Sequence, residues 1–188
     1  MKIAIVGNGS SLLRPKKGVE IDSHDLVIRQ NFYYDFMEPE TTGVKVDVWS
    51  CAFDAHEYDD KGRSKEIWCA RPLSWENGGQ WRILPCIERK RITRDICNGE
   101  YDRIAQIVRD AGGSNPGNGF LTLKFAQKIY PNADIDLYGY DFYEPPKHYY
   151  DKDFKISNAI LYKDHSPDIE KKLVQEGVKN GEYKRRIE

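Results

Sequence analysis

Two asparagine-bearing turns near the start of the chain carry side chains suited to holding a nucleotide. The glycine turn Gly7-Asn8-Gly9-Ser10-Ser11 follows an apolar run, and Asn31 follows the next one. A glycine turn at the end of an opening strand lets a phosphate group approach the backbone. An asparagine side chain offers both a donor and an acceptor, which suits Asn8 and Asn31 to the phosphate and ribose of a nucleotide. A purely structural role in the turn is the alternative for each.

A third motif, Pro116-Gly117-Asn118-Gly119, opens a segment with helical spacing of its apolar residues. With Asn118 as the N-cap, the exposed amides of the first turn would point at an anion in front of the helix. Capping alone would also account for this asparagine.

A histidine near the end of the chain is suited to proton transfer. His165 precedes a segment that is expected to become helical at about Pro167, where the helix dipole favours the neutral imidazole that a base requires. A histidine with a pKa near 6.5 can take a proton from an attacking hydroxyl at neutral pH. Glu170 or Asp164 would orient the ring. For a lone histidine, a structural role is the alternative.

Three further polar side chains lie in the same part of the chain. Tyr143, His148 and Tyr149 can donate hydrogen bonds to a departing phosphate, which would stabilise the transition state. Packing of the tyrosines in a surface segment is the alternative.

The apolar pattern predicts an α/β fold. Short apolar runs alternate with polar or helical segments, which is typical of a mostly parallel sheet flanked by helices in a single Rossmann-like domain over residues 1–188. In such a sheet the motif-bearing loops converge outside the carboxyl ends of the strands. Residues 144–164 lack a clear period, and we interpret them as a mobile lid. The expected strands are Lys2–Val6, Leu26–Arg29, Val44–Trp49, Glu66–Ala70, Arg82–Pro85 and Asp134–Tyr138, and the expected helices are Asp102–Ala111, Gly119–Ile129 and Asp168–Glu176.

Composition excludes several classes of protein. The 188 residues include 29 basic and 30 acidic side chains, so no general affinity for nucleic acid is expected. No apolar stretch approaches the roughly 20 residues of a transmembrane helix, and we expect a cytoplasmic protein. The four cysteines are widely spaced, which favours buried thiols over a zinc cluster or a disulfide scaffold; they are Cys51, Cys69, Cys86 and Cys97.

Two acidic pairs match the pattern that holds a divalent ion with a diphosphate. Asp134-Ile135-Asp136 lies on an expected strand, and Asp151-Lys152-Asp153 lies in a charged segment where chance matches are common. We therefore predict no metal site, no cofactor and metal-independent activity.

Taken in order, these motifs resemble those of the sialyltransferases of glycosyltransferase family 29, with a fainter likeness to the bacterial sialyltransferases of family 42. Residues 5–12 and 25–31 are similar to the family's long first motif, whose asparagines hold the cytidine nucleotide. Residues 116–126 and 136–139 resemble the second, His148-Tyr149-Tyr150-Asp151 resembles the third, and His165 with Glu170 fits the last, whose histidine is the general base.

The resemblance implies a GT-A-like variant of the Rossmann-like fold and an inverting, metal-independent transferase. Sialic acid or a related ulosonic acid would pass from a CMP-sugar donor to a hydroxyl of a glycan or a lipid-linked glycan. The donor would contact Asn8, Gly9, Ser11, Asn31, Gly117, Asn118, Gly119, Tyr143 and Tyr149, with His165 and His148 catalytic and Glu170 orienting.

Three departures from the family pattern bear on what is inherited. Gly117-Asn118 replaces a serine-threonine pair, Ser11 replaces an asparagine, and the cysteine pair of animal members has no counterpart. The missing disulfide fits a reducing compartment, and the short chain without an anchor suggests a bacterial or viral protein.

The sequence is also compatible with two alternative functions. One is a nucleotide-binding or glycan-binding module of the same fold without catalysis. The other is a dinucleotide oxidoreductase or a methyltransferase built on Gly7-Asn8-Gly9, although the third glycine of that fingerprint is missing.

Overall fold

A computed structural model describes residues 1–14, 16–31, 33, 37–51, 62–69, 92–95, 99–142, 144 and 165–186. Its strands form one parallel sheet of seven strands in the order β5-β4-β3-β2-β1-β6-β7. The strands are β1 (Lys2–Val6), β2 (Leu26–Gln30), β3 (Val48–Cys51), β4 (Glu66–Cys69), β5 (Ile92–Asp95), β6 (Asp134–Tyr138) and β7 (Lys184–Arg186). The predicted α/β class with a parallel sheet is confirmed.

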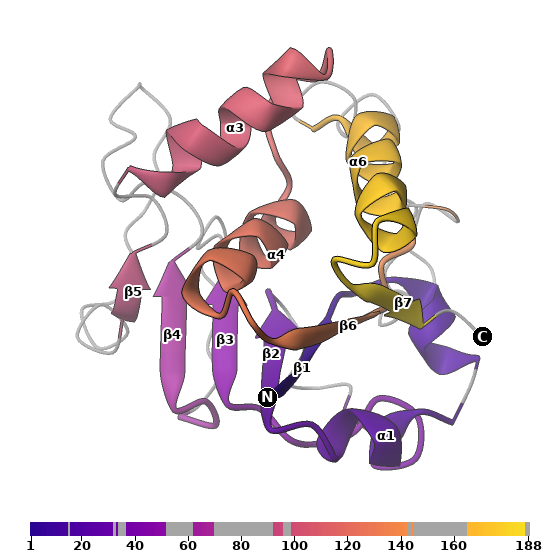
Figure 1. The fold of residues 1–188 in the computed structure, drawn as a ribbon. Helices are drawn as coiled ribbons and strands as arrows, with labels where there is room; N and C mark the ends of the chain where they lie inside the picture. Colours follow the sequence, from indigo (N-terminus) through magenta and orange to yellow (C-terminus); the bar gives the residue numbers. More distant parts are fainter. Residues whose placement is uncertain are drawn as a thin grey trace.

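Helices cover both faces of this sheet. In Figure 1, α3 (Glu100–Asp110), α4 (Asn118–Ile129) and α6 (Pro167–Lys179) lie above the sheet, whereas the short α1 (Gly18–Asp22) lies below it. The three longer helices match the predicted ones within three residues at each end. The short α1 and the 3-10 helix η1 (Ser10–Leu13) were not predicted, because neither is long enough to show a helical period. Among the described helices, none has the length and apolar character needed to cross a membrane.

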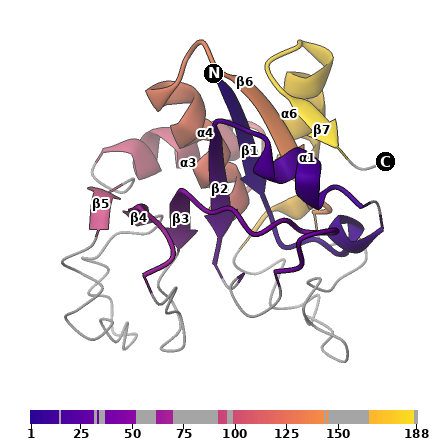
Figure 2. The ribbon, with the colours of Figure 1, turned by 90° about the horizontal axis from the view of Figure 1, so that it is seen from below.

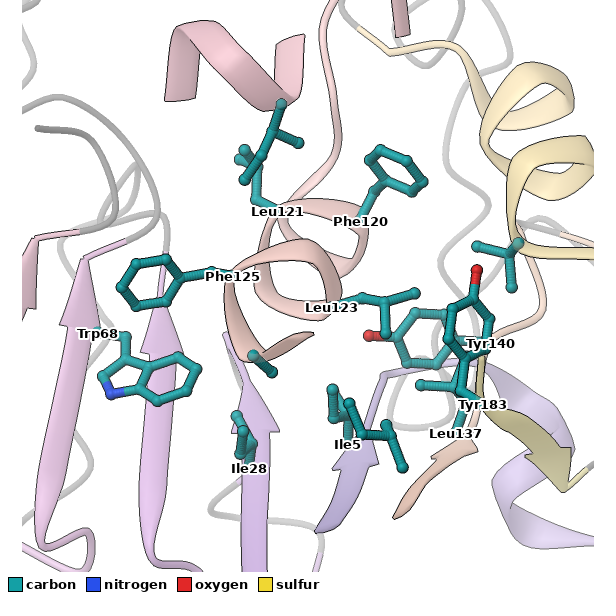
Figure 3. Close-up of a cluster of buried hydrophobic side chains, with 14 of the residues drawn as sticks. Ile5, Ile28, Trp68, Phe120, Leu121, Leu123, Phe125, Leu137, Tyr140 and Tyr183 are labelled. Atoms are coloured by element: carbon teal, nitrogen blue, oxygen red, sulfur yellow. The ribbon is translucent and has the colours of Figure 1, made fainter. Parts of the chain in front are cut away.

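The main core lies between the sheet and α4. Phe120, Leu121, Leu123 and Phe125 of α4 are all buried in this core. Figure 3 shows α4 lying over Ile5, Ile28 and Trp68, with Phe125 next to Trp68, whereas Phe120 and Leu121 point away from the sheet. The rings of Trp68 and Phe125 meet edge to face with centroids 5.1 Å apart. Because α4 is apolar on most of its surface, its position above the sheet is set by packing. The polar first turn of α4 is therefore held at one end of the sheet.

The segment before β3 is not the strand that its apolar pattern predicts. Its backbone bonds to side chains instead: the buried Arg29 donates to the carbonyls of Thr42 and Lys45 at 2.8 and 2.9 Å, and Asp22 accepts from the amides of Val44 and Lys45. With these groups occupied, ladder pairing begins only at Val48. The predicted strand 82–85 lies outside the described residues, and the short β5 and β7 were missed.

The sheet has its switch point between β1 and β6. The chain proceeds outward from β1 to β5 and then returns to place β6 on the other side of β1, as Figure 2 shows. The loops after β1 and β6 therefore start side by side and then diverge. The amides of Gly7 and Gly9 donate to the carbonyls of Tyr138 and Gly139 at 2.8 and 2.9 Å, so the two loops are joined backbone to backbone.

Gly9 is required by this close approach. A Cβ atom at this position would lie 2.4 Å from Cγ of Asp141 and 2.6 Å from the carbonyl oxygen of Gly139. Overpacking of this kind costs about 1–3 kcal/mol. We expect Gly9→Ala to lower the free energy of unfolding by about 3 kcal/mol, the upper end of that range, because a backbone atom is in the way. Denaturant unfolding measures the loss.

Gly112→Ala is the matched control, since a Cβ there meets nothing within 4 Å and only the φ of +89° is unfavourable. That strain alone costs about 1–2 kcal/mol. Equal losses in the two variants would show that the loop contact does not constrain Gly9.

Candidate functional site

The asparagines of two separate motifs meet at the carboxyl edge of the sheet. Nδ2 of Asn118 donates to Oδ1 of Asn31 at 2.8 Å and to the carbonyl oxygen of Ser50 at 3.0 Å. Asn31 directly follows β2, Ser50 lies near the end of β3, and Asn118 begins α4. The two motifs, 87 residues apart in sequence, are thus in direct contact.

One backbone carbonyl sets the orientation of both amides. The oxygen of Ser50 can only accept, so the atom of Asn118 facing it is the NH₂ group. The second hydrogen of that group requires an acceptor, which makes the facing atom of Asn31 its oxygen. Nδ2 of Asn31 is consequently turned away from Asn118. This order is the one that suits an asparagine donating to a phosphate or a ribose oxygen.

Asn118 is not the N-cap of α4, which corrects the capping interpretation. Gly117 occupies that position with ψ of 162°, and Asn118 is the first helical residue. Gly117 has no side chain with which to cap the helix, and the side-chain amide of Asn118 bonds to Asn31 after β2 and to Ser50 of β3. The interstrand contact therefore replaces the cap as the reason for an asparagine here.

The backbone amides of the glycine turn are bonded within the protein. Gly7 and Gly9 donate to the β6 loop, and the amide of Ser11 donates to Oδ2 of Asp141 at 2.7 Å. These three amides already have acceptors within the protein, and the predicted contact of Gly9 and Ser11 with the donor stays a prediction. The side chain of Asn8 lies at the same edge, with Nδ2 3.2 Å from the carbonyl oxygen of Gln30.

Asp141 is a site residue that the sequence motifs did not reveal. This buried carboxylate accepts from both the amide and the hydroxyl of Ser11. It thereby fixes the turn that carries Asn8 to the loop after β6. Ser11, expected to touch the donor, has its hydroxyl committed to Asp141. The signal for Asp141 was its position two residues after Gly139, at the end of a strand next to β1.

Tyr140 joins three elements at this edge. Its hydroxyl donates to the carbonyl oxygen of Gly119 at 3.0 Å and accepts from Nε2 of Gln30 at 2.7 Å. Burial raises the pKa of Tyr140 well above its usual value, so the hydroxyl stays protonated and keeps donating. The first turn of α4 is thereby tied to the ends of β2 and β6.

Two non-glycine residues adopt left-handed backbone conformations at this edge. Asn31 has φ of 45° and Phe142 has φ of 50°, and they follow β2 and β6 respectively. Asparagine tolerates this region, whereas for a bulky residue such as phenylalanine it is unusual. Strained residues of this kind concentrate at functional sites.

The segment that carries His165 is joined to the turn before α4. Ser166 Oγ accepts from the amide of Ser114 at 2.6 Å, and Oε1 of Glu170 accepts from the amide of Gly117 at 2.7 Å. His165 is half-buried and lies two residues before α6, which begins at Pro167 as predicted. The position of His165 relative to Asn118 is therefore set by these two bonds.

Glu170 is buried at this junction. Burial raises the pKa of Glu170 to about 7, and the bond from Gly117 opposes the shift only in part. Its orienting role toward His165 stays a prediction.

The remaining predicted site residues lie outside the described part of the chain. They are Tyr143, His148 and Tyr149, together with the Asp151-Lys152-Asp153 pair and all of the predicted lid except Glu144.

The other acidic pair is engaged elsewhere. Asp134 begins β6 at the opposite edge of the sheet and accepts from Lys184, while Asp136 is buried with Oδ2 3.2 Å from Nε2 of His24. Over the ranges that the structure describes, no group of three or more histidine, cysteine or acidic side chains is placed to hold a metal ion. Cys51 is fully buried, in agreement with its predicted burial.

A family comparison covers the first motif. Residues 1–47 match the model of glycosyltransferase family 29 (sialyltransferase), a range that contains Asn8, Gly9, Ser11 and Asn31. The chain resembles the sialyltransferases.

Solved sialyltransferase structures have the same fold. A mammalian sialyltransferase superposes with a TM-score of 0.65 at 20% identity, over 98% of this chain and 68% of the other. A mammalian sialyltransferase in complex with Gal-beta-1-3GalNAc-ortho-nitrophenol superposes with a TM-score of 0.58 at 18% identity, over 98% of this chain and 68% of the other. A point variant of the sialyltransferase Cst-II in complex with CMP gives 0.58 at 19% identity, over 98% and 79%. Among curated protein sequences, none matches. At these identities the likeness establishes a shared fold.

In this sialyltransferase-like chain, the raised pKa of Glu170 predicts a pH-dependent stability. Between pH 4.5 and 7 the unfolded state loses the Glu170 proton while the folded state retains it, so the free energy of unfolding falls as pH rises. The fall ends above the folded pKa and amounts to about 3 kcal/mol at most. Glu170→Gln keeps an oxygen for the Gly117 amide, and we expect it to remove this part of the pH dependence.

Denaturant unfolding at pH 5 and pH 8 measures the difference, with Glu176→Gln as a control at an exposed position of the same helix. An unchanged pH dependence in Glu170→Gln would contradict the assignment.

Proposed function

We propose that this protein is a glycosyltransferase that moves sialic acid or a related ulosonic acid from a CMP-sugar donor to a glycan hydroxyl, on a free or lipid-linked glycan. The observation that carries the proposal is the contact between Asn31 and Asn118 at the carboxyl edge of a sheet shared with sialyltransferases. The family match over residues 1–47 also supports the proposal. The matched range includes Asn8 and Asn31, which correspond by resemblance to the asparagines that hold the nucleotide in the family.

The proposed reaction inverts the anomeric carbon. The acceptor oxygen attacks that carbon through an oxocarbenium-like transition state, its proton passes to His165, and CMP departs with the bonding electron pair. Ser166 and Glu170 accept hydrogen bonds from Ser114 and Gly117, which keeps the segment that carries His165 next to the turn before α4. This supports the proposal, because such a step requires the base to be held in position.

The leaving phosphate is met by hydrogen-bond donors in this proposal. A monophosphate carries less charge than a diphosphate, so donors and a helix start can stabilise it without a metal ion. In α4 the first-turn amides of Asn118 and Gly119 have no acceptor within the helix. Tyr143, His148 and Tyr149 would supply side-chain donors, as the resemblance implies.

The geometry of the glycine turn argues against a dinucleotide or S-adenosylmethionine site. Those sites place a ligand against free amides of the turn after the first strand. Here the amides of Gly7, Gly9 and Ser11 bond to the β6 loop and to Asp141. CMP binding without transfer would instead support a non-catalytic module of the same fold.

Replacing His165 tests the base. We expect His165→Ala to lower kcat by about a hundredfold or more, because general base catalysis is lost, while CMP affinity stays nearly intact. Turnover with a CMP-sugar and CMP titration measure the two effects. Turnover equal to wild type would remove His165 from this role.

Replacing Asn31 tests the nucleotide site. We expect Asn31→Ala to weaken CMP binding by about tenfold, the value of one hydrogen bond, in a calorimetric titration that chelator does not affect. Asn31→Gly is the matched control, because glycine accepts φ of 45° without strain and also lacks the amide.

Equal losses in both variants would assign the effect to the side chain, whereas a loss confined to alanine would assign it to the backbone. Preference for UMP, GDP, NAD or S-adenosylmethionine over CMP would overturn the function. Activity that chelator abolishes and manganese or magnesium restores would overturn its metal independence.

A further inference from the structure

Asn118 has one polar atom without a hydrogen-bond partner among the described residues. The residue is only 8% exposed, and Oδ1 is buried while Nδ2 makes two bonds. An unsatisfied buried acceptor costs about 1–3 kcal/mol. The cost of this unsatisfied oxygen is therefore offset either by other interactions within the protein or by a bound group that donates a hydrogen bond to it.

The neighbouring hydroxyls cannot satisfy this oxygen. Thr122 Oγ1 donates its single hydrogen to the carbonyl oxygen of Asn118 at 2.7 Å. In the 2.6 Å contact between Ser50 and Thr122, the donor must then be Ser50, because the Thr122 hydrogen is already used. Both hydroxyl hydrogens are committed, and the amide of Asn118 cannot flip without placing its oxygen against the carbonyl of Ser50.

The position of this oxygen connects it to the nucleotide. It belongs to the first residue of α4, and its own amide group contacts Asn31, which holds the nucleotide in the proposed function. Because the side chains of Asn31 and Asn118 are in direct contact, a ligand that binds Asn31 lies close to Asn118.

The chemistry of the oxygen restricts what can bind there. An amide oxygen only accepts, so its partner must carry a hydrogen. A phosphate or carboxylate oxygen at neutral pH has none, whereas a ribose hydroxyl and the amino group of cytosine both do.

We propose that Oδ1 of Asn118 accepts a hydrogen bond from a hydroxyl or amino group of the bound nucleoside and makes the site selective for nucleosides that carry that group. This inference rests on the proposed function, with CMP as the nucleotide. A site with a buried polar group rejects an analogue that leaves it unpaired, as hydroxyl-recognising enzymes do. Asn118 is then a specificity residue.

The test compares CMP with analogues that each lack one donor. Calorimetric titration of the wild-type protein with CMP, 2′-deoxy-CMP, 3′-deoxy-CMP and UMP removes the two ribose hydroxyls and the amino group in turn. We expect one analogue to bind about tenfold or more weakly than CMP, which identifies the group. Asn118→Ala should bind that analogue and CMP within about threefold of each other, because the discriminating acceptor is gone.

Thr122→Val is the matched control. It breaks hydrogen bonds of the same buried network but leaves Oδ1 of Asn118 in place, so the discrimination of the wild type should persist. Thermal unfolding of each variant establishes that it is folded, and Asn118→Ser, whose shorter side chain also removes the amide oxygen, replaces Asn118→Ala in the comparison if the alanine variant does not fold.

The possible outcomes distinguish failure of the proposed role of Asn118 from failure of the proposed function. Wild-type affinities within about threefold for all four nucleotides would overturn this inference and leave the function standing, since none of the three donor groups would then be recognised. Equal discrimination in wild type and Asn118→Ala would also overturn it, because another residue would be reading the group. Failure of the wild type to bind CMP would overturn the proposed function and this inference with it.

Discussion

The backbone contact between the loops after β1 and β6 is the constraint on which the rest of the site depends. These loops flank the switch point of the sheet, where the chain changes direction. Gly9 allows the two backbones to meet, and Asp141 completes the contact by holding Ser11. Gly7 and Gly9, whose pattern in the sequence is typical of a ligand-binding turn, thus join two loops of the protein. Because this contact holds the glycine turn in place, it also fixes the position of Asn8 at the carboxyl edge of the sheet.

The start of α4 is held from three directions. Asn118 bonds to the ends of β2 and β3, Tyr140 bonds to Gly119 from the end of β6, and Glu170 of α6 bonds to Gly117. Such side-chain tethers position a helix terminus more narrowly than apolar packing does, because hydrogen bonds are directional. The same tethers bring the His165 segment to this terminus. The asparagine pair and the His165 segment, which we propose hold the nucleotide and supply the base, are therefore positioned by one connected set of contacts.

Sequence patterns predicted the parts of this structure that depend on local periodicity. The apolar runs at β1, β2 and β6 and the helical spacing of α4 appear where expected, since burial against the sheet requires those patterns. The segment before Val48 reads as a strand but is held by Arg29 and Asp22, which are distant side chains that no local pattern shows. Short β7 has too few residues for a pattern.

For the candidate site, the sequence predicted which loops would meet better than it predicted the hydrogen bonds between them. The meeting of Asn31 and Asn118 follows from the rule that loops converge at the carboxyl edge. The sequence did not predict that the amides of Gly7 and Gly9 donate hydrogen bonds to Tyr138 and Gly139, because this depends on which strand lies beside β1. Asp141 was missed for the same reason. Its role exists only once β6 is known to be the neighbour.

The pairing of β1 with β6 also bears on the order in which the protein assembles. Lys2 stands opposite Asp134, so one edge of β1 stays unpaired until synthesis has reached β6, far along the chain. Contacts of such long sequence separation form late and slow the folding of a domain. During synthesis β1 therefore presents an unpaired edge, and the turn that carries Asn8 gains its partner only when residues 138–141 have been made.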